Sequence, residues 1–223
     1  MQIGKLLTIG FFLTSSQALA GIVTFTSSAA FNAALGGSPT LVENFGTFSA
    51  GTIIAPGSTF NGITYASFDL GIHGTQGLIS NQFNSFSGVS LGANQDNGAA
   101  QFFFDGNSFV INFAPTFAIG IFYNVNANSG TFGITTTDGT ASTGSASYDT
   151  STFVFAGLIS TTPFSSATIF SDSGGNGTAS FNIPEIVLSQ TSTPEPASIT
   201  VSALGMMGLI AGLLARRRAG KSL

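Results

Sequence analysis

The sequence contains no cysteine and no tryptophan, and it has a single histidine among its 223 residues. Without cysteine the chain cannot form disulfides, thiol nucleophiles or thiolate zinc sites. Its stability must therefore come from apolar burial and strand pairing, and a chain of this length can bury a sufficient core. The 23 phenylalanines supply much of the apolar area that such a core needs.

Charged residues make up only 6% of the chain, against about 25% in an ordinary soluble domain. All five basic residues lie near the two ends: Lys5, Arg216, Arg217, Arg218 and Lys221. Residues 21–192 therefore hold eight carboxylates and no lysine or arginine. Because nucleic-acid binding requires cations that neutralise phosphates, this composition excludes nucleic acid as a partner.

The first 20 residues have the pattern of a secretory signal peptide. Lys5 supplies a positive charge, residues 6–13 form an apolar segment, and Ala18 and Ala20 provide a small-x-small cleavage site before Gly21. The pattern predicts that signal peptidase removes residues 1–20 after export. A buried N-terminal helix is the alternative, and the absence of a helix cap argues against it.

A second apolar segment, residues 199–215, contains no charge and is followed by the arginine cluster Arg216, Arg217 and Arg218. As a helix it would span about 25 Å, which suits a thin bilayer. The positive-inside rule places the basic tail, residues 216–223, in the cytoplasm. The main domain, residues 21–189, is therefore expected on the outer side of the membrane.

The linker between the main domain and this helix, residues 190–198, carries Pro194, Glu195 and Pro196. Prolines on both sides of a glutamate keep the segment extended and outside any helix or central strand. The succession of a Pro-Glu-Pro tripeptide, a short transmembrane helix and a terminal arginine cluster resembles the PEP-CTERM sorting signal. An ordinary tail anchor behind a proline-rich linker is the alternative.

The resemblance implies processing and a destination. Proteins with this signal are substrates of exosortase, a membrane peptidase that cleaves near the tripeptide, and they are sorted to the cell surface or exopolysaccharide matrix of Gram-negative bacteria. An exosortase-like peptidase is thus an expected partner, and membrane anchoring is expected to be transient.

Apolar residues alternate with small or polar ones at 109–113 and again at 117–125, which is the period of a half-buried strand. A short link is predicted between the two runs, at 114–116. Asp105 and Gly106 form a hairpin-turn signal just before the first run, so we expect them to join two paired strands.

Similar short runs recur throughout residues 21–189, with glycine-rich turns and no amphipathic helix. They predict an all-β fold, an antiparallel two-sheet sandwich with a jelly-roll order. One short helical turn is expected at 27–35, and a bulge is expected at Pro184 and Glu185, where the apolar face changes side. The patches FNAALGGSPTLVENFG and FNGITYAS are similar to segments of PEP-CTERM ectodomains, which implies a lectin-like sandwich.

A catalytic role is not predicted. His73 is the single imidazole that could act as a general base, and no nucleophile-elbow motif surrounds it. A glycoside-active enzyme needs two carboxylates at a set separation, but nearly all acids here lie beside glycine or asparagine, as turn formers do. Turn chemistry also accounts for Asp96 and Asp105, the acids best placed for calcium. We expect no cofactor, with a structural Ca²⁺ at these two residues as the alternative.

Carbohydrate binding is the main alternative to a purely structural role. Sugar rings stack on exposed aromatic side chains and hydrogen-bond to Asp, Asn or Gln. Tyr123 falls on the apolar alternation and is predicted to lie in the core, whereas Tyr148 lies in a polar stretch beside Asp149 and is the best candidate for a sugar contact. The sequence thus predicts an exported structural protein of the cell surface or matrix, with an exopolysaccharide-binding, lectin-like module as the alternative.

Overall fold

The computed structural model describes residues 21–36, 41–82, 85–95, 101–126, 128–144, 146–148, 152–172 and 180–190. The predictions for Ala18, Ala20, residues 194–196 and residues 216–218 lie outside this part of the chain. Within the described residues, no helix has the length and apolar character needed to cross a bilayer.

Most of the described residues lie in fourteen strands, which one short α-helix and one 3₁₀ turn interrupt. The strands are β1 (Ile22–Phe25), β2 (Leu41–Glu43), β3 (Ile53–Ile54), β4 (Ser58–Phe60), β5 (Ile63–Asp69), β6 (Gln76–Ser80), β7 (Ser90–Asn94), β8 (Phe103–Phe104), β9 (Ser108–Asn126), β10 (Asn128–Thr135), β11 (Thr140–Ser142), β12 (Ala146–Tyr148), β13 (Thr152–Asp172) and β14 (Ser180–Ser189). The helix is α1 (Ser28–Ala34), and the 3₁₀ turn spans Gly71–His73.

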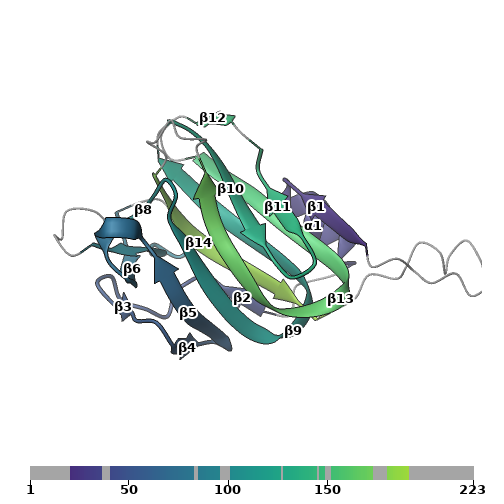
Figure 1. Cartoon of the computed structure of the whole chain (residues 1–223), viewed down its shortest axis with the longest axis horizontal. Coiled ribbons are helices and arrows are strands. Elements are labelled where there is room, and N and C mark those ends of the chain that lie inside the picture. Colours follow the sequence, from purple (N-terminus) through teal and green to yellow (C-terminus); the bar gives the residue numbers. More distant parts are fainter. Residues whose placement is uncertain are drawn as a thin grey trace, which may run out of the picture.

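Two long strands, β9 and β13, pair with each other along almost their whole length and form the centre of the sheet (Figure 1). The other edge of β13 pairs with β1 and β10, and the other edge of β9 pairs with β5 and then with β14. From β14 the sheet continues through β7 and β6 to β3. Every pair is antiparallel, so the predicted all-β antiparallel class is confirmed.

The strands form one hydrogen-bonded sheet, whereas the sequence predicted two. A link between two strands was expected at Pro115, but β9 runs through this residue, so the segments on either side of it belong to the same sheet. The register of β9 with β13 shifts between Ile159 and Phe164, and Phe164 lies opposite Thr116. Because the ladder is already interrupted here, the missing N–H of Pro115 costs no pairing, and the strand continues instead of ending.

The inner face of this curled sheet holds the main core, and the alternation predicted along β9 is confirmed. Phe109, Ile111 and Phe113 are buried, as are the odd-numbered residues from Ile119 to Val125. Tyr123 is fully buried among them and donates a hydrogen bond from its hydroxyl to the carbonyl of Gly133 at 2.7 Å. The core prediction for this tyrosine is therefore correct.

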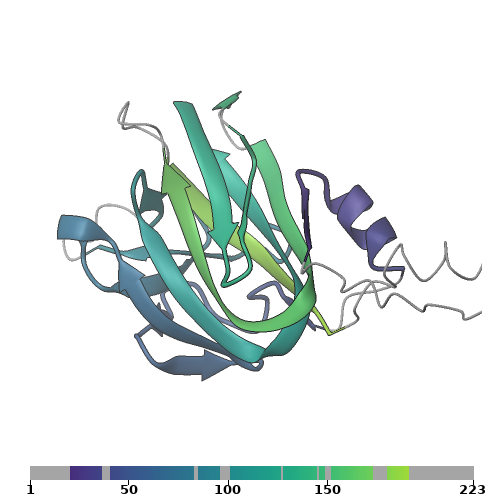
Figure 2. The same ribbon diagram turned by 45° about the vertical axis from the view of Figure 1, so that its right-hand side comes forward.

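The opposite face of the same sheet, which we call the outer face, is partly covered by α1 (Figure 2). The helix begins after Ser27, whose hydroxyl accepts from the Ala30 N–H at 3.5 Å, so the predicted helical turn with a serine cap is confirmed. Phe31 and Leu35 bury themselves against Phe155 and its neighbours on the sheet. A small second core therefore lies between the helix and the outer face.

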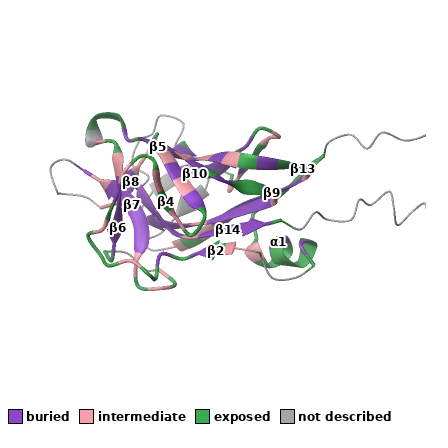
Figure 3. Cartoon of the chain, turned by 90° about the horizontal axis from the view of Figure 1, so that it is seen from below, coloured by how far each residue is buried: buried purple, intermediate pink, exposed green. Residues whose placement is uncertain are grey.

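Strand β14 lies between β9 and several short strands and is buried along most of its length (Figure 3). Its register with β9 shifts between Asn182 and Glu185. This shift confirms the bulge predicted at Pro184 and Glu185, and it is the reason why Ile183 and Ile186 can both face the main core.

The turn at Asp105 and Gly106 exists, but it does not close a hairpin. The Asn107 N–H donates to the Phe104 carbonyl at 3.0 Å, and Gly106 has a φ of 75°, so the local turn chemistry is as predicted. However, β8 before the turn pairs with β14. The expectation that the turn joins two paired strands is therefore wrong: it carries the chain from a short strand beside β14 into β9.

Candidate functional site

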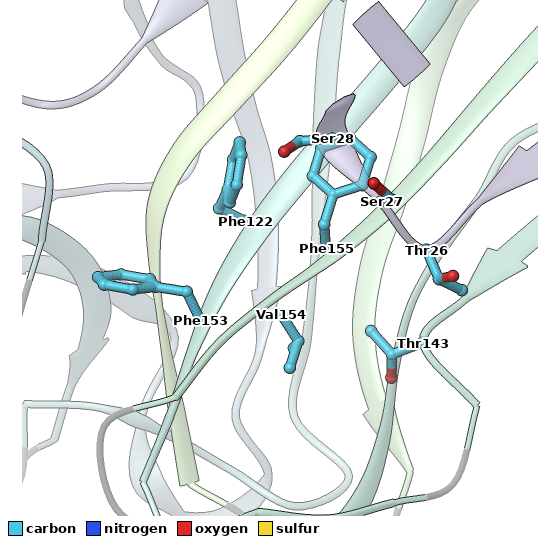
Figure 4. A pocket seen from close by; sticks show the side chains of 8 residues that line it. All are labelled: Thr26, Ser27, Ser28, Phe122, Thr143, Phe153, Val154 and Phe155. Carbon is cyan, nitrogen blue, oxygen red and sulfur yellow. The ribbon is translucent and has the colours of Figure 1, made fainter. Parts of the chain in front are cut away.

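A cavity of about 330 Å³ opens at the edge of β13, beside the start of α1 (Figure 4). It lies between the link that follows β1, the residue after β11, and the strands β9 and β13. Its lining residues are Thr26, Ser27, Ser28, Phe122, Thr143, Phe153, Val154 and Phe155. We call this cavity, together with the neighbouring ring of Phe86, the aromatic groove.

The strand register explains why three phenylalanines and one acid meet at this place. Phe155 of β13 lies opposite Phe122 of β9, and Phe122 lies opposite Glu185 of β14. Residues directly opposite in an antiparallel pair share a face. Phe153, two residues before Phe155, is on that face as well. All four side chains therefore project from the outer face.

Phe86, which comes from the connection between β6 and β7, packs on two of these rings. Its ring centroid lies 4.9 Å from that of Phe153, with the planes 18° apart, and 5.0 Å from that of Phe122, with the planes 82° apart. Phe122 also meets Phe155 at 4.9 Å. The side chain of Phe86 is 51% exposed and that of Phe153 is 39% exposed. The rings are thus fixed by contacts with one another while two of them remain accessible to solvent.

Hydroxyl groups line the other side of the groove. Thr26, Ser27 and Ser28 stand where the chain passes from β1 into α1, and Thr143 follows β11. Of these residues, Ser27 is also the cap of the helix. The Thr143 hydroxyl already donates to the Gly144 carbonyl at 3.0 Å and accepts from the Phe132 N–H at 3.2 Å. The serine and threonine hydroxyls at the start of the helix can each donate one hydrogen bond, so they are the groups of this side that could satisfy a polar ligand.

No charged side chain is among the residues that line the cavity, and residues 21–192 contain no lysine or arginine. Glu185 is half-buried beside Phe122. Burial raises the pKa of this carboxyl above its ordinary value. The lining of the groove therefore combines apolar ring faces with neutral hydroxyls, and one acid lies beside it, opposite Phe122 on the neighbouring strand.

Such an arrangement suits a ligand with both apolar and hydroxyl-bearing surfaces. Sugar rings have C–H faces that pack on aromatic rings and hydroxyl edges that hydrogen-bond to polar side chains. Phosphorylated or sulfated ligands do not suit it, since recognition of such groups relies on arginine or lysine. The chemistry of the groove is that of a neutral, polar ligand.

The tyrosine predicted to contact sugar is only partly located by the structure. The backbone of Tyr148 is in β12, opposite Asn128 of β10, while the placement of its side chain and of Asp149 lies outside the described residues. Tyr65 is buried. The prediction for Tyr148 and Asp149 is therefore not tested, and the structure brings a different set of aromatic residues to the surface.

The residues considered for metal binding or catalysis do not gather in the described part of the chain. Asp105 occupies the turn before β9, Asp96 lies outside the described residues, and His73 ends the 3₁₀ turn. Among the residues that the structure describes, no three His, Asp or Glu side chains lie close enough together to hold a metal ion. Structural calcium at Asp96 and Asp105 stays a prediction.

Two further carboxylates are engaged within the fold. Glu43 is buried, and its two oxygens accept from the Phe45 N–H and the Asn61 side-chain amide, each at 2.6 Å. Phe45 and Asn61 have positive φ values, 61° and 48°, so this acid stabilises two unusual backbone conformations. We conclude that Glu43 organises the turns around β2 and the β4–β5 hairpin.

Asp138, the second of these acids, lies in the turn between β10 and β11. One carboxylate oxygen accepts hydrogen bonds from the hydroxyls of Ser160 and Thr162, each at 2.5 Å. These bonds hold the pKa of Asp138 below its ordinary value. Because both donors are in β13, the acid ties the β10–β11 turn to the central strands.

The aromatic residues of the groove were not identified from the sequence, although one signal was available. Phe122 stands at an even position of a strand whose odd positions form the core, and Phe153 and Phe155 repeat every second residue in β13. Large apolar residues on both phases of a strand indicate that both faces are covered or used. Phe86 lies in a connection without periodicity, so no local pattern could place it beside them.

No protein-family model matches the chain, and no curated protein matches it. Among solved structures, that of the CBM51-2 and INT domains from Clostridium perfringens ZmpB is similar with a TM-score of 0.36 and 10% sequence identity. The similarity covers 67% of this chain and 32% of that chain, so the present chain spans about a third of that structure. At this level of similarity, the chemistry of the groove has to be argued from the residues of this chain.

Proposed function

We propose that this chain is an exported, non-catalytic protein of the bacterial cell surface or extracellular matrix, and that its β domain holds polysaccharide in the aromatic groove. The observation that carries the binding function is the pair of exposed rings, Phe86 and Phe153, beside a row of hydroxyls in a domain without lysine or arginine. The curled sheet would correspond to the lectin-like, jelly-roll sandwich that the sequence resemblance implies.

The sorting part of the proposal rests on the sequence at the two ends. An export signal ends before Gly21, and Pro194, Glu195 and Pro196 precede an uncharged segment and an arginine cluster. Among the residues that the structure describes, the first strand begins at Ile22 and the last ends at Ser189. Cleavage by signal peptidase and by an exosortase-like peptidase would thus remove the terminal segments without cutting a strand.

The groove suits polysaccharide for three physical reasons. Its volume of about 330 Å³ and its open side fit a chain that passes through better than an enclosed small molecule. Its rings are pre-positioned by contacts with one another, so little side-chain entropy is lost on binding. Its polar groups are neutral hydroxyls, which match the hydroxyls of a sugar in a water-rich matrix.

The sorting proposal is tested by the intact mass of the protein recovered from the surface of its own or a related exosortase-containing host. We expect loss of residues 1–20 together with loss of the C-terminal helix. Replacing Pro194 and Pro196 with alanine should leave the first cleavage unchanged and prevent the second. A surface form that still carries residues 216–218 would contradict the proposal.

The binding proposal is tested by measuring retention of the purified chain, kept in mild detergent, on insoluble neutral glucans. We expect Phe86→Ala and Phe153→Ala each to weaken binding about tenfold, because each removes one stacking surface. Ile72→Ala is the matched control, since Ile72 is 93% exposed and lies in the 3₁₀ turn after β5. Equal binding by all four proteins, or no binding by the unmodified chain, would refute the function.

A further inference from the structure

The acid at the edge of the groove occupies a fixed position relative to the rings. Glu185 follows the β14 bulge and lies directly opposite Phe122 in the β9–β14 ladder. The Cβ atoms of such a pair are about 4.5–5.5 Å apart. On the same strand and face, Val187 is buried in the second core beneath α1. The carboxylate therefore stands on a rigid strand, at the boundary between the helix-covered part of the outer face and the groove.

The surroundings of Glu185 give its charge an influence on any ligand. The residue is only half-buried, so part of its surface is accessible to solvent. It is not counted among the buried polar atoms of the described chain that lack a partner. An ionised carboxylate accepts hydrogen bonds and donates none. With no lysine or arginine in residues 21–192, no side-chain cation of the domain other than a protonated His73 could offset this charge.

These features act in opposite directions on two classes of glycan. The hydroxyls of a neutral sugar can donate to the carboxylate while the ring packs on the phenyl groups. A uronate carries its own carboxylate on the sugar ring, and two like charges about 5 Å apart at a partly desolvated surface repel each other. The repulsion corresponds to about a tenfold loss of affinity or more.

We infer that Glu185 makes the aromatic groove selective for neutral glycans and excludes chains rich in uronic acid. This inference rests on the proposed polysaccharide-binding function and adds the substrate class and the residue that sets it. Glu185 would contact the ligand directly, at the hydroxyl edge of the sugar that stacks beside Phe122.

The test compares a neutral glucan oligosaccharide with an oligouronate of equal length. Binding is measured by calorimetry on the purified full chain in mild detergent, at about pH 8 and low salt. The high pH is chosen because burial raises the pKa of Glu185 and a high pH favours the ionised carboxylate. We expect the unmodified chain to bind the glucan at least about tenfold more tightly than the uronate. Glu185→Gln should strengthen uronate binding about tenfold. It should weaken glucan binding about fivefold, because a neutral amide accepts weaker hydrogen bonds than a carboxylate does, so the ratio of the two affinities should fall.

Asp69→Asn is the matched control, because it removes the same charge from β5, which pairs with the start of β9. Phe122 lies near the other end of β9, so this variant should keep the selectivity of the unmodified chain. A second measurement needs no variant: salt at about 0.5 M should screen the repulsion and raise the affinity of the unmodified chain for uronate.

The possible failures are distinguishable. If the unmodified chain binds neither glycan, the proposed function is wrong and the inference falls with it. If it binds the glucan but Glu185→Gln leaves the ratio of the two affinities unchanged, the function stands and the role of Glu185 is refuted. An equal shift in Asp69→Asn would likewise refute it, since selectivity would then come from the net charge of the domain.

Discussion

The packing of α1 on the outer face depends on two glycines, and this dependence gives a quantitative prediction. Gly157 of β13 lies directly opposite Gly120 of β9. A Cβ atom added at Gly157 would lie 2.7 Å from Cε1 of Phe155 and 2.8 Å from Cδ2 of Phe31. Both distances are too short for carbon atoms in contact, so Gly157→Ala must displace at least one ring.

Neither ring can move without cost. Phe31 is fully buried, with its centroid 5.4 Å from that of Phe155 and 5.6 Å from that of Phe25. Inserting a methyl group into such packing costs about 1–3 kcal/mol. Replacing a strand glycine with alanine returns about 0.5–1 kcal/mol through the unfolded state. We therefore expect Gly157→Ala to lower the free energy of unfolding by about 1–2 kcal/mol.

The assay is urea unfolding of four proteins: the unmodified chain, Gly157→Ala, Phe155→Leu and the double variant. Leucine at position 155 is smaller than phenylalanine and makes room for the added methyl group. The contact with Phe31 remains in that background, so we expect the glycine substitution to cost less there than in the unmodified chain, with a coupling energy of about 1 kcal/mol. Additive effects, within about 0.5 kcal/mol, would refute the argument that Gly157 is required by the ring of Phe155.

Three further predictions concern the acids. Asp138→Asn weakens the acceptor for the hydroxyls of Ser160 and Thr162, so it should lower the free energy of unfolding by about 1 kcal/mol at neutral pH. Because the pKa of Asp138 is lowered in the fold, the difference in stability between the two proteins should disappear as the pH falls through that pKa, which calorimetry can measure. The pKa of Glu185 is raised by burial, so its ionisation destabilises the fold as pH rises, and Glu185→Gln should raise the melting temperature at about pH 7 but not at about pH 4. Glu43→Gln replaces one buried acceptor with a donor facing an N–H, and should lower the free energy of unfolding by about 2–3 kcal/mol in urea titrations.

The parts of the fold that the sequence predicted are those with a local physical cause. Alternation along β9 sends successive side chains to opposite faces, so Tyr123 could be assigned to the core without knowledge of the partner strands. The serine cap of α1 and the bulge at Pro184 also depend on residues within a few positions of each other.

The parts that the sequence did not predict depend on partners distant in the chain. The turn at Asp105 and Gly106 has hairpin chemistry, but β14, more than 70 residues later in the chain, takes the place beside β8. Pro115 reads as a break between strands, yet it coincides with a shift in the β9–β13 register, where no N–H is needed. In both cases the tertiary context decided between two outcomes that the local residues allowed.

The candidate site was missed for a related reason. The sequence predicted a sugar contact at a tyrosine in a polar segment, whereas the exposed rings of the groove are phenylalanines, one in a strand whose other face is core and one in a connection. Phe122 and Phe155 could have been recognised by their phase within each strand. Phe86 could not, because it approaches Phe153 only through the tertiary path of the β6–β7 connection.

The outer face has two uses that depend on residue size at equivalent positions. Where β9 and β13 carry glycine opposite glycine, α1 packs closely on the sheet and Phe31 is buried. Where the same strands carry Phe122 opposite Phe155, the rings fill that space themselves, and the helix begins beside them. The groove is thus bounded by the helix and rigid because of it. With no lysine or arginine in residues 21–192 to hold an acidic matrix, retention among polysaccharides would have to come from these ring faces and their neighbouring hydroxyls.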